Sequence, residues 1–129
     1  MITAGYAGAL GLLFLALTVR VIMRRGAVKA ALGDGDDIQL RRRIRAHANF
    51  VEYVPLTLLL MALVEIHAAH SWLVHAVGLS LLAGRIVHAS SIVKEPEVMA
   101  GRVAGMLLTL TALALASVVG MASAFGLLG

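Results

Sequence analysis

Three side chains able to bind an ionic ligand, Arg45, Asn49 and Glu52, stand at the start of a long apolar stretch of the sequence. On a helix that turns about 100° per residue, Asn49 lies about 40° and Glu52 about 20° from Arg45, so the three share one stripe. His47 points away from that stripe. A cation, an amide and a carboxylate in this arrangement suit an anionic ligand that also carries an ammonium group or amide donors.

Further ionisable side chains lie near the ends of the other apolar stretches. Arg20 stands toward the end of the first stretch, Arg85 and His88 toward the end of the third, and Arg102 at the start of the fourth. If the stretches are helices that alternate in direction, these groups meet the stripe at one end of the molecule, and only Glu65 lies elsewhere. The pattern predicts a cationic cleft with one embedded acid.

Structural interpretations of these groups remain open. A carboxylate in lipid is costly unless a cation compensates it, so Arg45 and Glu52 are also candidates for a pair that locks the bundle. His88 is equally a candidate for a core histidine bonded to a carbonyl group, although its spacing from Arg85 favours a functional role. Basic side chains near helix ends commonly extend to the headgroups and set topology. That interpretation applies to Arg20, Arg24, Arg41, Arg42, Arg43 and Lys94.

The composition indicates that the solvent of this chain is lipid. Of its 129 residues, 60% are hydrophobic and only 14% are charged, and the mean hydropathy is +0.94. A membrane-spanning helix needs about 20 mostly apolar residues, and the sequence offers four such segments, at about 2–23, 45–67, 71–90 and 101–127. We therefore expect an all-α protein: an antiparallel four-helix bundle in the membrane, forming one transmembrane domain over residues 1–129.

Basic residues predict the orientation of this bundle. They concentrate between the first two helices, whereas the turn near residues 67–71 and both chain ends carry no Lys or Arg. The positive-inside rule then places the loop at about 26–40 in the cytoplasm and both termini outside it. The net charge of +4 does not indicate nucleic acid as a partner, because the basic residues follow no aromatic-studded face.

Several local signals refine this layout. The second helix should begin in water near Asp37, an acceptable N-cap, and bend at Pro55. A very short turn around residues 69–71 should pair the second helix with the third, and the spacing of Gly101 and Gly105 permits close helix approach. The N-terminus lacks the positive region of a secretory signal, so we expect the first helix to be retained.

The chain contains no cysteine, so any thiol chemistry must be supplied by a ligand. The histidines His67, His70 and His75 cluster near the outer turn, but their spacing fits no helical pair of metal ligands. We therefore expect no metal site and interpret these histidines as interfacial residues.

Two motifs resemble those of a known family. Arg45-Ala46-His47-x-Asn49-x-x-Glu52, followed by Pro55, is similar to the second-helix signature of the membrane-associated proteins in eicosanoid and glutathione metabolism (MAPEG), and Arg85-x-x-His88 is similar to the third-helix motif. The family includes microsomal glutathione transferases. The resemblance covers the whole four-helix layout and is nearest to the compact bacterial branch, which implies a location in the bacterial inner membrane.

The resemblance implies a homotrimer that binds glutathione between neighbouring subunits near the cytoplasmic face. By motif, the cofactor contacts would come from Arg20, Arg45, Asn49, Glu52, Arg85 and His88, and Arg102 would be the catalytic arginine beside the sulfur. Better-studied eukaryotic members carry Arg, Tyr and Ser where this chain has Ala48, Ile92 and Val103. Those departures argue against a specific eicosanoid reaction.

The implied function is a membrane-bound, glutathione transferase-like or peroxidase-like enzyme. It would activate the glutathione thiolate for attack on lipophilic electrophiles or lipid hydroperoxides. Two alternatives stay open: a non-catalytic lipid-binding scaffold of the same fold, and a small transporter or channel subunit. A transporter should carry polar groups through the full membrane depth, whereas the outer half of these helices is nearly apolar.

Overall fold

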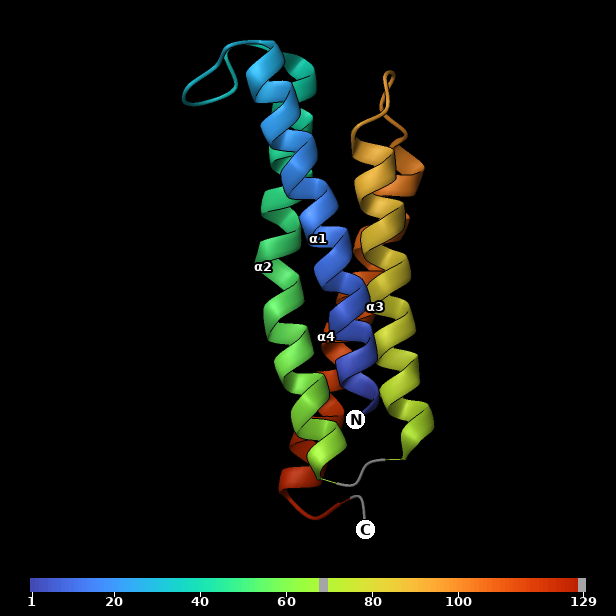
Figure 1. The fold of residues 1–129 in the computed structure, drawn as a ribbon. Coiled ribbons are helices and arrows are strands. Elements are labelled where there is room, and N and C mark those ends of the chain that lie inside the picture. The colour runs from blue at the N-terminus through green and yellow to red at the C-terminus, as the bar shows by residue number, and fades with distance from the viewer. Residues whose placement is uncertain (68–69, 128–129) are drawn as a thin grey trace.

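The computed structural model describes residues 1–67 and 70–127, and within them every regular element is a helix. Each helix is long and apolar enough to cross a membrane, which confirms the all-helical, four-span prediction. In chain order the elements are α1 (Ile2–Ala27), α2 (Ile38–Ile66), α3 (Ser71–Ile92) and α4 (Met99–Ala124) (Figure 1).

The helices extend beyond their apolar cores, which explains most differences from the predicted bounds. α1 continues past residue 23 to Ala27 and carries Arg24 and Arg25 in its last turn, where basic side chains complement the helix dipole. α2 begins directly after Asp37, whose side chain accepts a bond of 2.6 Å from the Leu40 amide, so the predicted N-cap is confirmed. The predicted turn at 69–71 lies partly outside the described residues.

α4 ends earlier than predicted, at Ala124 rather than residue 127. Gly126 adopts a φ of 67°, a left-handed conformation that glycine tolerates and that terminates helices. The Gly126 amide donates to the Ser123 carbonyl at 3.1 Å and the Leu127 amide to the Ala122 carbonyl at 2.9 Å. The glycine thus ends the helix before Leu127.

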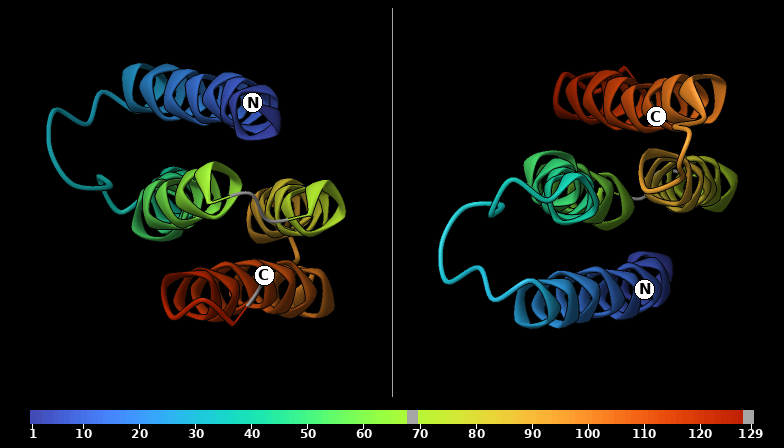
Figure 2. Two further views of the ribbon diagram at one scale, coloured as in Figure 1. Left: turned by 90° about the horizontal axis from the view of Figure 1, so that it is seen from below. Right: turned by 90° about the horizontal axis from the view of Figure 1, so that it is seen from above.

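The four helices form three layers. α1 lies on one side, α2 and α3 lie side by side in the middle, and α4 covers the opposite side (Figure 2). In the described part of the chain α1 packs on α2 and α3 and makes no contact with α4. The connections 28–37 and 93–98 lie at one end of the bundle, here named the charged end, and both termini lie at the other, the termini end (Figure 1).

Glycines allow α3 and α4 to pack closely at the charged end. A Cβ atom at Gly105 would lie 2.5 Å from the His88 amide nitrogen, and one at Gly84 would lie 2.8 Å from the Gly105 carbonyl oxygen. Real Cβ atoms cannot approach backbone this closely, so both positions require glycine. A Cβ at Gly101 would meet the Ser91 hydroxyl at 2.1 Å, and the predicted close approach at Gly101 and Gly105 is therefore confirmed.

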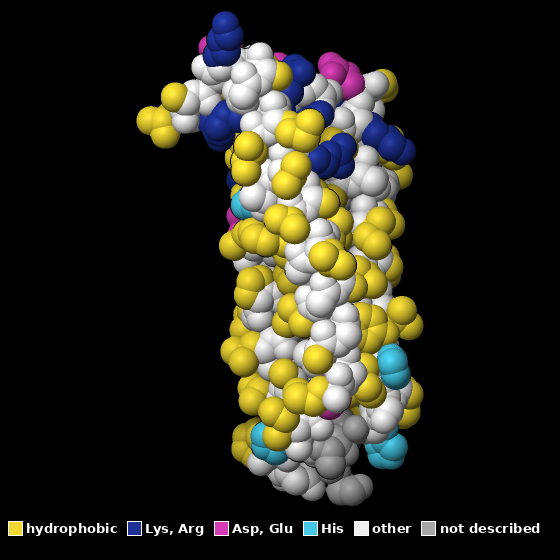
Figure 3. Space-filling view, viewed as in Figure 1, with side chains coloured by type: hydrophobic (Ala, Val, Ile, Leu, Met, Phe, Trp, Pro, Cys, Tyr) yellow, Lys and Arg dark blue, Asp and Glu magenta, His cyan; other side chains and the backbone are white. Residues whose placement is uncertain are grey.

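The outer surface of the bundle is apolar along its middle, with Lys and Arg side chains gathered at the charged end on the face shown in Figure 3. Large apolar side chains point outward from all four helices, as expected of surfaces that face lipid. They include Leu12, Ile22, Leu56, Leu59, Leu79, Ile86, Leu107 and Val118.

Candidate ligand-binding site at the charged end

Acidic residues of the 28–37 connection hold several of the arginines at the charged end. Arg24 forms two bonds with the Asp37 carboxylate, of 3.0 and 2.6 Å, and Arg41 pairs with Asp34. Arg25 donates to the Gly33 carbonyl at 2.8 Å. These arginines therefore fasten the loop to the helix ends.

The carboxylates of Asp37 and Asp34 are held in the charged form. Hydrogen bonds from Arg24, and then from the Leu40 amide, hold the pKa of Asp37 at about 2. Bonds from Arg41, and then from the Asp36 amide, lower the pKa of Asp34. The start of α2 thus keeps its negatively charged cap across the neutral pH range, where it complements the positive end of the helix dipole.

Arg85 lies at the centre of the bundle near the charged end and is only 1% exposed. Its Nε donates to the Thr109 hydroxyl at 2.9 Å, its Nη1 to the Asn49 side-chain oxygen and its Nη2 to the Met106 sulfur at 3.4 Å. One guanidinium therefore connects α2, α3 and α4. A buried cation requires such partners, because an unpaired one is strongly destabilising.

His88 and Arg102 lie on facing helices, one turn nearer the charged end than Arg85 and Gly105. His88 is 3% exposed, and its backbone packs against Gly105. Arg102 pairs with Glu97 across the start of α4, with 2.8 Å between Nη1 and Oε1, and both side chains stay partly exposed. Arg102 is therefore the cation of this cluster that remains accessible from outside.

The 93–98 connection is tied to the first turns of α2. Arg42 donates to the Lys94 carbonyl, and Gln39 donates to the Glu95 carboxylate at 2.6 Å. Because Glu97 belongs to the same connection, these bonds also restrain the counter-ion of Arg102. The beginning of α2 thus positions the beginning of α4.

Three of the proposed cofactor contacts lie on the surface of the single chain. Arg20, Arg45 and Glu52 are exposed, and the Arg20 carbonyl accepts a bond of 3.0 Å from Arg43. The ion pairs between described residues are Arg24–Asp37, Arg41–Asp34, Arg41–Asp36 and Arg102–Glu97. Within this described part of one chain the alternative interpretation, an Arg45–Glu52 pair that locks the bundle, is therefore not observed, because two helical turns, about 10 Å of rise, separate these residues.

An apolar hollow adjoins Arg102 on the outer face of α4. It has a volume of about 400 Å³, and Met99, Val103, Met106 and Leu107 form its walls together with Arg102. A guanidinium at the edge of an apolar hollow can stabilise an anion while a lipophilic molecule occupies the remaining space. The arrangement suits chemistry between a charged cofactor and a molecule dissolved in the bilayer.

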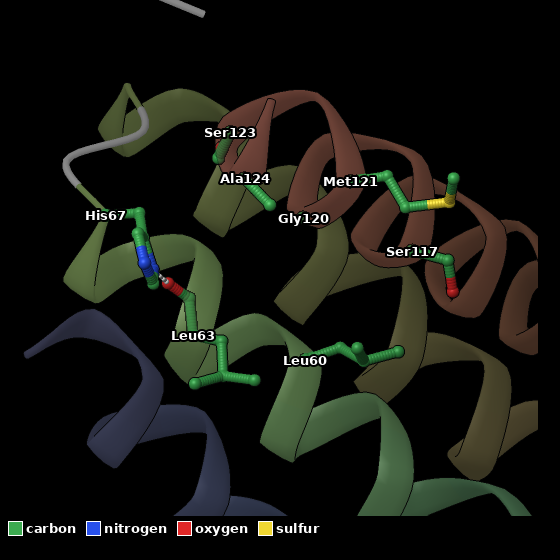
Figure 4. Close-up of a pocket in the computed structure, with 8 residues that line it drawn as sticks. All are labelled: Leu60, Leu63, His67, Ser117, Gly120, Met121, Ser123 and Ala124. Atoms are coloured by element: carbon green, nitrogen blue, oxygen red, sulfur yellow. Dashed lines mark hydrogen bonds between the residues drawn. The ribbon is translucent and has the colours of Figure 1, made fainter. Parts of the chain in front are cut away.

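The described residues that line the pockets at the termini end include no Lys, Arg, Asp or Glu. One pocket of about 350 Å³ lies between α2 and α4, and Figure 4 shows Leu60, Leu63 and His67 on one side of it. The hydroxyls of Ser117 and Ser123 bond to carbonyls of their own helix, and His67 Nδ1 bonds to the Leu63 carbonyl at 2.8 Å. This pocket is therefore apolar, and most of its polar side chains are hydrogen-bonded to backbone carbonyls.

Two contacts that fasten α1 to α2 were missed from the sequence. Glu65 accepts hydrogen bonds from the backbone amides of Ile2 and of Thr3, the latter at 2.8 Å, so a carboxylate of α2 caps the first turn of α1. His47 meets the Thr18 hydroxyl at 3.1 Å. Glu65 was the one embedded acid predicted to lie away from the charged end. The predicted topology places the start of the first helix at the same end as Glu65, where an acid complements the helix dipole.

The geometry defines a class of protein: a multi-pass membrane bundle whose Lys and Arg side chains gather at one end (Figure 3), with an accessible arginine beside an apolar hollow. The comparison with known proteins agrees with this class. The chain belongs to the MAPEG family, whose model matches residues 3–122, so the resemblance seen in the two motifs is confirmed.

Relatives that are named as inner membrane proteins support a location in the inner membrane. The chain is 40% identical over 88 residues to the inner membrane protein YecN of Escherichia coli strain K12, an alignment that covers 68% of this chain and 67% of YecN. YecN of strain CFT073 matches to the same extent. With four apolar helices, this likeness supports an integral inner-membrane location.

Proposed function

We propose that this chain is a membrane-bound, glutathione transferase-like enzyme that also has the groups needed for peroxidase chemistry. It would stabilise the glutathione thiolate for attack on lipophilic electrophiles or lipid hydroperoxides. One observation carries the proposal: Arg102 lines an apolar hollow on α4, one helical turn before Gly105, which packs against the backbone of the buried His88. Membership of the MAPEG family, which includes glutathione transferases, supports it.

The polar groups match the chemistry of glutathione, which has two carboxylates and one ammonium group. Arg20 and Arg45 would meet the carboxylates, and Glu52 would meet the ammonium group or an amide. Asn49 and His88 would contact the peptide. The exposure of Arg45 and Glu52 on the single chain fits a site that a neighbouring copy completes, so we propose a homotrimer of antiparallel bundles with glutathione between subunits.

The reaction needs no protein nucleophile. Arg102 favours the thiolate over the thiol by charge, and the thiol proton passes to water. In conjugation the sulfur forms a bond to an electrophilic carbon while the leaving group departs with its electron pair. In peroxidase chemistry two glutathione molecules are oxidised to the disulfide while the hydroperoxide is reduced to an alcohol and water.

The orientation follows the same proposal. The charged end would face the cytoplasm, where glutathione is available, and both termini would lie outside. Lipophilic substrates would reach the hollow beside Arg102 directly from the bilayer.

The test compares wild type with Arg102→Leu in detergent. Ultraviolet absorbance of the bound thiolate and turnover of a generic aryl halide should both fall, turnover by about 100-fold, as for loss of one strong electrostatic contact. Lys94→Met is the matched control, because it removes a cation from the neighbouring turn without touching the hollow. Equal thiolate signals in wild type and Arg102→Leu would remove Arg102 from this role, and no turnover in wild type would favour a scaffold or transporter.

A further inference from the structure

The buried guanidinium of Arg85 has a fixed orientation. The Thr109 hydroxyl accepts from Arg85 Nε at 2.9 Å and donates to the Gly105 carbonyl at 2.9 Å, so its hydrogen is committed to its own helix. The Met106 sulfur accepts a hydrogen bond from Arg85 Nη2 at 3.4 Å. Because the guanidinium is planar, fixing Nε and Nη2 also fixes the direction of Nη1.

That direction determines how the Asn49 amide is oriented. A guanidinium nitrogen only donates, so the atom of Asn49 that faces Arg85 Nη1 must be the oxygen Oδ1, as the structure has it. The Asn49 nitrogen Nδ2 therefore points away from Arg85. Among the described residues no hydrogen bond is donated by this nitrogen, and Asn49 is only half-buried.

We propose that Arg85 is a positioning residue that orients the Asn49 amide so that its NH₂ group is presented to the ligand. The matching ligand group is an acceptor, a carboxylate or a peptide carbonyl. The inference rests on the proposed function for the identity of that ligand as glutathione. It assigns to Arg85 an action through Asn49 in place of a direct contact.

Energetic reasoning supports a role beyond stability. Burying an ion costs free energy that well-packed apolar residues of similar volume do not incur, yet Arg85 is placed where three helices meet. Without it, the Asn49 amide is free to present either its oxygen or its nitrogen to the site. Arg85 thus removes an ambiguity that would weaken recognition of an anion.

The test is a double-mutant cycle on glutathione affinity, measured by titration calorimetry of the purified protein in detergent. Arg85→Met should weaken binding about tenfold, the scale of one oriented hydrogen bond to a charged group. Asn49→Ala should weaken it by at least as much. In the Asn49→Ala background, Arg85→Met should cause almost no further loss, whereas additive losses would reduce Arg85 to a structural residue and overturn the inference.

Two further variants keep the test decisive if Arg85→Met fails to fold. Asn49→Asp keeps an oxygen acceptor for Arg85 but has no NH₂ group, so it should melt at or above the wild-type temperature while losing glutathione affinity. Thr109→Val is nearly isosteric and frees Arg85 Nε, so it should weaken binding in the otherwise wild-type chain but not in the Asn49→Ala background. Wild-type affinity in Asn49→Asp would overturn the inference, whereas a wild type that binds no glutathione would overturn the proposed function.

Discussion

The two ends of the bundle use polar residues differently. At the charged end α3 and α4 approach so closely that Gly105 leaves no space for a Cβ, and the guanidinium of Arg85 links three helices. At the termini end open hollows lie between neighbouring helices, whereas the hollow at the charged end is lined by α4 alone, and Glu65 fastens α1 through two backbone amides. Rigid packing therefore coincides with the candidate site, as precise placement of ligand contacts requires.

Two glycines of α4 allow the sharpest test of this contrast. Gly105→Ala should destabilise the protein by about 2 to 3 kcal/mol, because the new methyl group overlaps the α3 backbone. Gly120→Ala should stay within about 0.5 kcal/mol of wild type, since its Cβ would meet only Val64, at 3.7 Å. Thermal unfolding in detergent measures both, and equal melting temperatures would show that the two ends pack alike.

Glu65 tests whether the termini end is fastened without affecting the site. Glu65→Ala should speed amide hydrogen exchange in the first turn of α1 and lower the melting temperature by less than Gly105→Ala does. Glu65→Gln, which keeps one carbonyl oxygen, should fall between Ala and wild type. Glutathione affinity should not change in either variant, and a parallel loss of affinity would mean that the ends are coupled.

A change at Glu97 tests how strongly its carboxylate limits the stabilisation of the thiolate by Arg102. Its carboxylate offsets part of the charge of Arg102, so Glu97→Gln should raise the thiolate signal of bound glutathione by about two- to fivefold, the range for an exposed ion pair. Glu95→Gln is the matched control, because Glu95 bonds to Gln39 rather than to an arginine. A lower signal in Glu97→Gln would instead make Glu97 an orienting group for Arg102.

Protonation of Asp37 should have the smallest effect on stability, and that effect should be confined to the start of α2. Its pKa is lowered from 3.8 to about 2, so its stabilising contribution is complete above about pH 4 and is lost as the pH falls toward 2. The Leu40 amide resonance should report this transition, and Asp37→Asn should abolish it. Asp36→Asn, at a neighbouring exposed carboxylate, should leave the transition in place.

The sequence predicted the helices well because hydropathy and capping are local properties. Four apolar segments and the N-cap at Asp37 needed no tertiary information. The ends of α1 and α4 were misplaced because apolar length does not reveal where a helix stops in water. The left-handed Gly126 that ends α4 follows a run of apolar residues that hydropathy alone continues.

The candidate site was predictable as a gathering of basic side chains at one end, but the hydrogen-bond partners within it were not. Arg85 and Asn49 are 36 residues apart and Arg85 and Thr109 are 24 apart, so no local pattern connects them. The absent Arg45–Glu52 pair shows the converse: two described residues on one stripe were too distant to meet. The cofactor roles of Arg20, Arg45 and Glu52 stay predictions.

The attachment of α1 has a consequence for biogenesis. Its first turn is capped by Glu65, 63 residues later in the chain, and Tyr6 meets His75, which lies 69 residues later. During translation α1 is therefore complete before either anchor has been synthesised. Until then only its own apolar length can keep it in the bilayer, and its final docking must follow the insertion of α2 and α3.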